Sequence, residues 1–136
     1  MANMKRCIDT CAYSRLMFGA AGLQTLMEEA DSLVVPVIVL GELYAGFGAG
    51  SRVAENENRL NAFLELPGVR IQDASWDIAR RYAILVNELR RKGTPIPSND
   101  IWIAATALEL GARLITYDAH FKSIPGLIVD IPVSLT

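Results

Sequence analysis

The feature that most constrains the fold is a regular alternation of short apolar runs with longer helical segments. Between successive runs, apolar residues return every three or four positions, which is the periodicity of an amphipathic helix. Strands joined through helices need crossover connections, which make the strands parallel and cover both faces of the sheet. The alternation therefore predicts an α/β fold, a three-layer α/β/α sandwich around a central, mostly parallel five-stranded sheet.

The same periodicity, together with glycine and proline positions, predicts where each element lies. We expect strands at residues 5–8, 32–35, 69–72, 113–116 and 127–131. We expect helices at 16–30, from Pro36 to about Phe47, at 52–66 and 75–92, and from a cap at Ser98 or Asn99 to Leu110, with a short helical turn from Asp118 to about Lys122. No linker or repeat divides the sequence, so residues 1–136 are expected to form one domain.

The composition excludes several protein classes. A chain that is 51% hydrophobic and 21% charged is expected to be globular and ordered. No apolar run reaches the roughly 18 to 20 residues that a membrane span needs, and no signal-peptide core precedes Asp9. We therefore expect a cytoplasmic protein with no membrane association. Cys7, Cys11 and His120 are too few to form a zinc site, and the two cysteines are expected to be free thiols in a reducing compartment.

The formal net charge of −2 does not provide the basic surface that nucleic-acid binders usually have. Contact with phosphates would therefore depend on local patches or on bound cations. Arg15, Arg52 and Arg59 are candidates for such contacts, although a solvated helix face is the preferred explanation for each.

Four acidic residues stand at positions where a carboxylate is unusual. Asp9 directly follows the first predicted strand and Asp118 follows the fourth, so both belong to the carboxyl edge of the sheet, where open parallel sheets form their sites. Glu42 and Asp100 lie on helix faces that are otherwise apolar, where a charge needs a partner or a metal. Small residues one turn further on would bring those helices close to the sheet; they are Ala45, Gly46 and Ala104.

Clustered carboxylates suit a hard divalent cation such as Mg²⁺ or Mn²⁺, and such ions activate water and neutralise charge during phosphodiester hydrolysis. The hydroxyls of Thr10 and Thr116 are placed to orient these carboxylates or their waters. Each acid also has a structural alternative. Asp9 and Asp118 can cap the helices that follow them, Asp100 can favour a helix N-terminus, and Glu42 can be a surface residue.

Four segments taken in order resemble the PIN-domain family, and more narrowly its VapC-type toxins. They are Ile8-Asp9-Thr10, the stretch from Gly41 to Gly46, the stretch from Asn99 to Ala105, and the stretch from Leu114 to Phe121. The resemblance covers nearly the whole chain. One small departure is Cys11, where relatives often have serine.

This resemblance implies a PIN-like sandwich and a Mg²⁺- or Mn²⁺-dependent endoribonuclease that leaves a 5′-phosphate and a 3′-hydroxyl. It implies that Asp9, Glu42, Asp100 and Asp118 are the catalytic metal ligands, and that Thr116 provides a conserved hydroxyl. It also implies a toxin that cleaves RNA, forms a homodimer, and is inhibited by a cognate antitoxin in a larger toxin–antitoxin assembly. The helices between Leu16 and Leu66 would form the antitoxin groove.

Other classes compete with this interpretation. A phosphoacceptor receiver-like domain would use Asp73 after the third strand, but no lysine follows a late strand. A dinucleotide binder would need G-x-G-x-x-G after a strand, whereas Gly46, Gly48 and Gly50 follow a helix and are expected to end it. A catalytically silent PIN-fold interaction module would lack one or more of the acids. His120 is expected to pack beside Phe121 in a structural role.

Overall fold

The computed structural model describes residues 3–133 and contains a five-stranded sheet in the order β3-β2-β1-β4-β5. All neighbouring strands are parallel, which confirms the predicted α/β architecture. The strands are β1 (Lys5–Ile8), β2 (Ser32–Pro36), β3 (Val69–Gln72), β4 (Arg113–Ile115) and β5 (Val129–Asp130). β2 and β3 lie on one side of β1, and β4 and β5 lie on the other. The strand order therefore reverses at β1, and the topological switch point of the sheet lies beside the end of β1.

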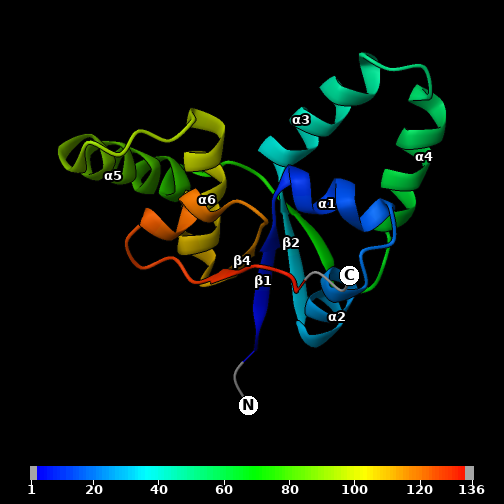
Figure 1. The fold of residues 1–136 in the computed structure, drawn as a ribbon, viewed down its shortest axis with the longest axis horizontal. Coiled ribbons are helices and arrows are strands. Elements are labelled where there is room, and N and C mark those ends of the chain that lie inside the picture. Colours follow the sequence, from blue (N-terminus) through cyan, green and yellow to red (C-terminus); the bar gives the residue numbers. More distant parts are fainter. Residues whose placement is uncertain (1–2, 134–136) are drawn as a thin grey trace.

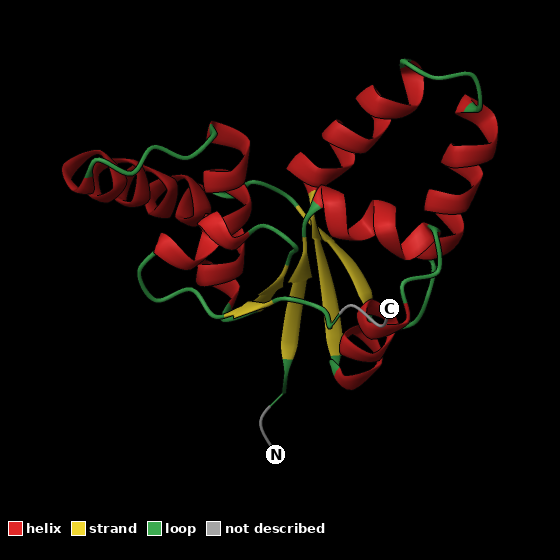
Figure 2. Cartoon of the chain, in the orientation of Figure 1, coloured by secondary structure: helices red, strands yellow, loops and turns green. Residues whose placement is uncertain are grey.

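Helices lie on both sides of this sheet, as Figures 1 and 2 show. In that view α5 and α6 lie to the left of the strands, α1 and α2 lie to the right, and α3 and α4 form a pair that extends beyond the upper end of the sheet. The helices are α1 (Thr10–Met17), α2 (Ala21–Glu29), α3 (Val37–Gly48), α4 (Val53–Leu64), α5 (Trp76–Lys92) and α6 (Ser98–Leu110), followed by the 3₁₀ turn η1 (Ala119–Ser123). No described helix is long and apolar enough to cross a membrane.

The core forms where the central strands meet these helices. Ile8 and Ile115 are completely buried, as are Leu23 of α2 and Ile78 of α5. A parallel strand that is covered on both faces needs apolar side chains on both, which explains the buried apolar run of β2 and the buried apolar ends of β1 and β4. This packing fixes the ends of β1 and β4, and those ends carry Asp9 and Thr116.

The predicted helix at 16–30 is wrong, because two helices replace it. The first, α1, already begins at Thr10. The helical conformation is interrupted at Phe18 to Ala20, and α2 begins at Ala21. Gly19 has φ of +83°, a left-handed conformation that ends the first helix. The apolar spacing continued through the break, so periodicity alone did not reveal it.

Several predicted boundaries need smaller corrections. Pro36 ends β2 and is the N-cap of α3, so it lies before the helix and not in its first turn. Neither Ser98 nor Asn99 caps α6; the N-cap is Pro97, and no side chain caps that helix. The helix predicted at 52–66 spans Val53–Leu64, and the strands predicted at 113–116 and 127–131 are shorter, at Arg113–Ile115 and Val129–Asp130. Thr116 therefore lies just beyond β4.

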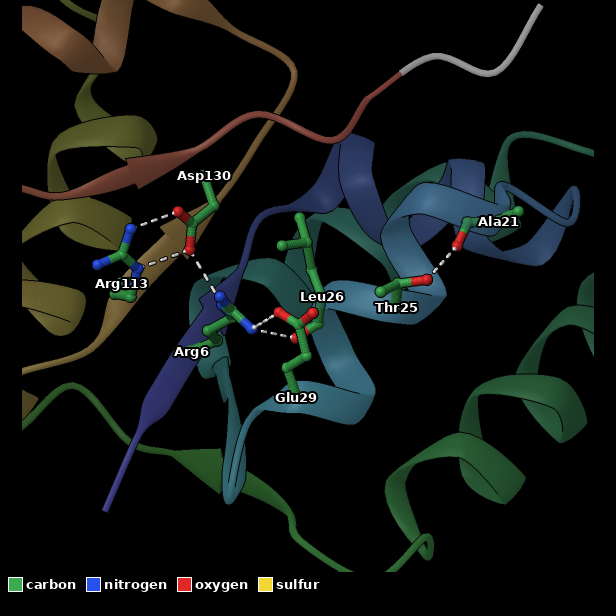
Figure 3. A network of polar contacts seen from close by, with 7 residues as sticks. All are labelled: Arg6, Ala21, Thr25, Leu26, Glu29, Arg113 and Asp130. Atoms are coloured by element: carbon green, nitrogen blue, oxygen red, sulfur yellow. Dashed lines mark hydrogen bonds and ion pairs between the residues drawn. The ribbon is translucent and has the colours of Figure 1, made fainter. Parts of the chain in front are cut away.

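A network of ion pairs joins the edge of the sheet to its centre (Figure 3). The buried Arg6 of β1 donates to Asp130 of β5 at 3.0 Å and to the carbonyl oxygen of Leu26 at 2.6 Å, and it pairs with Glu29 at 3.3 Å. Arg113 of β4 donates to both carboxylate oxygens of Asp130, at 2.8 and 2.7 Å. One carboxylate thus connects three strands, and Arg6 also connects the sheet to α2.

Candidate active site

All four predicted carboxylates line one pocket at the carboxyl edge of the sheet, with a volume of about 510 Å³. They come from four different places: the end of β1, helix α3, the first turn of α6, and the loop after β4. The full lining is Asp9, Thr10, Cys11, Ser14, Arg15, Glu42, Asp100, Tyr117, Asp118 and Phe121. The topology therefore brings together residues separated by more than a hundred positions in the chain.

Asp9 is the N-cap that its sequence position suggested, and it also lines the pocket. Its Oδ1 accepts a hydrogen bond of 2.8 Å from the backbone amide of Ala12, so it is the N-cap of α1. Its Oδ2 accepts a hydrogen bond of 2.5 Å from the hydroxyl of Thr116. Only 5% of the residue surface is exposed, yet it lines the pocket. Capping and a functional role are compatible here because the carboxylate uses different oxygens for different partners.

Glu42 lies on α3 opposite the start of α1, where its Oε1 accepts a hydrogen bond of 2.7 Å from Thr10. The reason given for its placement was partly wrong. Ala45 and Gly46 are exposed, and a Cβ added to Gly46 would meet no atom within 4 Å, so they do not bring α3 close to the sheet. Ala104 of α6, by contrast, is fully buried, as expected for a close helix–sheet contact.

Asp100 and Asp118 are linked through a histidine that was expected to be only structural. The Nε2 atom of His120 lies 3.1 Å from Oδ2 of Asp100, and its Nδ1 atom lies 2.8 Å from Oδ1 of Asp118. The same ring also contacts Phe121, with centroids 4.8 Å apart, so the structural part of the expectation is confirmed. Asp118 is the N-cap of η1 through the amide of His120, and Asp100 lies in the first turn of α6.

The carboxylates lie close enough to perturb one another. Burial raises the pKa of Asp9, and the charges of Asp100 and Asp118 raise it further, against the hydrogen bonds from Thr116 and Ala12. Burial also raises the pKa of Asp100, as do the charges of Glu42 and Asp118, while His120 opposes the rise. Mutual repulsion of this kind is relieved when a cation binds, so the electrostatics fit a cation site.

The donor set is one of hard oxygens, which suits Mg²⁺ or Mn²⁺ better than softer ions. In residues 3–133, however, no three acidic, histidine or cysteine side chains stand in an arrangement that is already able to coordinate a metal ion. Asp100 and Asp118 are occupied by His120, and Glu42 by Thr10. Binding would therefore require these side chains to turn away from their present partners.

Sequence reasoning gave no site role to Ser14, Tyr117 or His120, and it did not separate Arg15 from the other surface arginines. Ser14 and Arg15 line the pocket because α1 starts at Thr10, and the sequence did not predict this start. The spacing of His120, two residues after Asp118, was the one signal that could have placed it at the site. The prediction of two free thiols is confirmed: Cys7 is buried and Cys11 is exposed at the pocket.

Comparison with known proteins agrees with this geometry. The PIN domain family model matches residues 6–127. Ribonuclease VapC2 of Rickettsia felis is 33% identical over 106 residues, which are 77% of this chain and 78% of that protein. The crystal structure of VapBC2 from Rickettsia felis bound to a DNA fragment from their promoter matches with a TM-score of 0.84 at 28% identity, covering 93% of this chain and 98% of the other.

A further match is the Mycobacterium tuberculosis structure of VapBC-5, a member of the VapBC family of toxin–antitoxin systems. It has a TM-score of 0.71 at 26% identity and covers 94% of this chain and 97% of the other. The sheet order, the acidic pocket and these matches together define a PIN-fold protein. The chain belongs to the PIN-domain family and, within it, to the group of VapC ribonucleases.

Proposed function

We propose that this chain is a divalent-metal-dependent endoribonuclease and the toxin of a toxin–antitoxin pair. The observation that carries the proposal is the convergence of Asp9, Glu42, Asp100 and Asp118 on one pocket at the switch point of the sheet. Relatives named as ribonucleases support RNA as the substrate. The four carboxylates would hold Mg²⁺ or Mn²⁺. Such an ion would lower the pKa of a bound water and neutralise the charge that develops on the phosphodiester.

The chain's own residues prepare this site in two ways. Thr116 and the amide of Ala12 each donate a hydrogen bond to one oxygen of Asp9, so the carboxylate is already held in one orientation before a cation binds. Before a cation binds, Thr10 holds Glu42 across the pocket and His120 holds Asp100 and Asp118 in the same region, and these contacts would be exchanged for the cation. Cleavage by activated water is proposed to leave a 5′-phosphate and a 3′-hydroxyl.

The cognate antitoxin is proposed to bind in a separate, smaller pocket of about 290 Å³, between α1, α3 and α4. Its lining combines apolar side chains, including Met17, Phe18 and Phe47, with Arg52 and with Arg59, which pairs with Glu55 of the same lining. A surface of this composition suits an apolar helix that also carries acidic residues. The toxin–antitoxin complexes among the similar structures support this partner.

The proposal also includes a homodimer within a larger toxin–antitoxin assembly, a cytoplasmic location and a single domain over residues 1–136. A receiver-like phosphoacceptor domain finds less support, because Asp73 does not line the acidic pocket. A silent interaction module is disfavoured by the presence of all four acids.

The direct test is cleavage of a mixed-sequence RNA by the purified chain, in Mg²⁺ or Mn²⁺ and in chelator. We expect cleavage that requires the cation, and loss of at least about a hundredfold in rate for Asp100→Asn. Asp77→Asn is the matched control, because Asp77 is also a first-turn acid but is exposed on α5, away from the pocket.

Wild-type cleavage that persists in chelator would contradict the proposed metal dependence. Cleavage by Asp100→Asn at the rate of Asp77→Asn would contradict the proposed catalytic role of the carboxylate site. Transfer of phosphate from a small phosphodonor onto Asp73, without RNA cleavage, would support the receiver-like alternative.

A further inference from the structure

A second pocket, of about 450 Å³, adjoins the acidic pocket and shares two of its wall residues, Arg15 and Tyr117. The rest of its lining comes from Phe18, the following residues 19–22, and Val133. The side chains of Arg15 and Tyr117 therefore stand where the two pockets meet. A chain that lies across the carboxylates can continue into the second pocket past this pair.

Arg15 provides a positive charge at the boundary between the pockets. Its guanidinium carbon lies 4.2 Å from the centroid of the Tyr117 ring, in a cation–π contact. Within residues 3–133 no carboxylate forms an ion pair with it. The contact with Tyr117 holds the guanidinium in place, while its N–H groups stay available to an acceptor.

Phe18 provides an unpacked aromatic ring in the lining of the same pocket. The residue is 91% exposed, because it lies in the break between α1 and α2. Beside it in the lining are Gly19, Ala20, Ala21 and Gly22, none of which carries a long side chain. One of these glycines is required by packing, because a Cβ on Gly22 would lie 2.5 Å from the carbonyl oxygen of Val133.

We propose that this second pocket binds the nucleotide next to the scissile phosphodiester, with its base unstacked from its neighbours and stacked on Phe18. Arg15 would contact the phosphate that joins this nucleotide to the reacting one. Single-stranded RNA is recognised in this way, by aromatic stacking of splayed bases combined with cationic contacts to the backbone. The inference rests on the proposed ribonuclease function and adds a substrate subsite to it.

The composition of the pocket favours RNA over a protein segment as its occupant. The pocket is continuous with four carboxylates that are proposed to act on a phosphodiester, and its charged wall residue is a cation. A polyanion that is bound at the acidic site through cations must leave that site along a neutral or basic path. Arg15 and the rings of Tyr117 and Phe18 provide such a path.

Binding can be tested separately from cleavage. Short single-stranded RNAs that carry 2-aminopurine at successive positions are added to the full-length Asp100→Asn variant, and fluorescence reports stacking of the modified base. We expect a rise in fluorescence at a position next to the cleavage site, where the base leaves its neighbours, and loss of that rise with at least about tenfold weaker affinity when Phe18→Ala is added. Phe18→Tyr should retain both. Trp76→Ala is the control, because Trp76 is another exposed aromatic residue, 81% exposed, and it lines neither pocket.

Cleavage provides the second readout. In the otherwise wild-type chain, Phe18→Ala and Arg15→Ala should each raise KM for single-stranded RNA about tenfold and change kcat much less. Unchanged KM and an unchanged fluorescence rise in both variants would overturn the subsite even if the wild type is an active ribonuclease. The subsite is also wrong if Phe18→Ala weakens only antitoxin binding, as Phe47→Ala is expected to do. Failure of the wild type to cleave any RNA would overturn the proposed function, while the fluorescence experiment would still decide the subsite.

Discussion

Thr116 donates its side-chain hydroxyl to Oδ2 of Asp9, and the backbone amide of Asp118 donates to the same hydroxyl oxygen at 3.0 Å. Thr116 is completely buried just beyond β4, so this hydroxyl connects the first acid of the site to the loop that carries the last one. The connection explains why a threonine, and not merely a β-branched residue, is suited to this position.

We expect Thr116→Val, which keeps the shape and removes the hydroxyl, to lower cation affinity and RNA cleavage by about 10- to 100-fold. Asp9 would lose one of the hydrogen bonds that stabilise its ionised form, and the amide of Asp118 would lose its acceptor. Cation affinity is measured by calorimetric titration with Mn²⁺. Thr116→Ser restores the hydroxyl and should recover most of both losses. If valine and serine variants bind Mn²⁺ equally, the hydroxyl does not position Asp9.

Without metal, the acidic pocket should lower the stability of the folded chain. The pKa values of Asp9 and Asp100 are raised by burial and by neighbouring carboxylates, so the folded state binds their protons more tightly than the unfolded state does. The stability that comes from these protons is fully present below pH about 4 and is lost as pH rises through the raised values.

Asp100→Asn should therefore stabilise the metal-free chain at pH 7 by about 1 kcal/mol, a few degrees in Tm, and by less at pH 4. Thermal melts of the two proteins across this range give the difference directly. Added Mg²⁺ should raise the Tm of the wild type and leave that of the variant nearly unchanged. A variant that is less stable than the wild type at pH 7 would mean that the contact of Asp100 with His120 outweighs the repulsion.

The sheet could be predicted because its strands are short apolar runs separated by helices, and this pattern has few alternatives. The break at Phe18 could not be predicted in the same way. Leu16, Leu23 and Leu26 keep a helical spacing across it, and only the left-handed Gly19 ends the first helix. Local periodicity reports which face is apolar, but it does not report where the chain changes direction.

The carboxylates could be predicted for a related reason: their positions follow from strand ends and apolar helix faces. The side chains that link these carboxylates could not, apart from the two-residue spacing of His120 from Asp118. Arg15 reaches Tyr117, and His120 reaches Asp100, across contacts that depend on how α1 and α6 pack on the sheet. Side chains that meet only through tertiary packing leave no spacing in the sequence.

The two cysteines should differ sharply in reactivity. Burial raises the pKa of the Cys7 thiol, and the nearby charge of Asp9 raises it further, so it remains protonated. Cys11 is exposed at the acidic pocket. Iodoacetamide at pH 8 should modify Cys11 and leave Cys7 unmodified until the chain is unfolded, as peptide mass spectrometry would detect. Rapid labelling of Cys7 in the native protein would contradict its burial.

Asp130 is expected to be the main acid-sensitive contact of the sheet. Its pKa is lowered, chiefly by the hydrogen bonds from Arg113 and then by Arg6, so the folded state holds the ionised form. The resulting stability is present above the unfolded pKa of about 4 and is lost as pH falls through the lower folded value. Its sign is therefore opposite to that of Asp9 and Asp100.

Asp130→Asn should reduce the free energy of unfolding at pH 7 by about 2–4 kcal/mol, because it leaves Arg6 buried without its carboxylate partner in the sheet. Urea denaturation at pH 7 and pH 3 measures the loss, which should be smaller at pH 3. Glu55→Gln is the matched control: it breaks the exposed pair with Arg59 on α4 and should cost no more than about 0.5 kcal/mol. Equal losses in the two variants would mean that the buried network stabilises the sheet no more than a surface pair does.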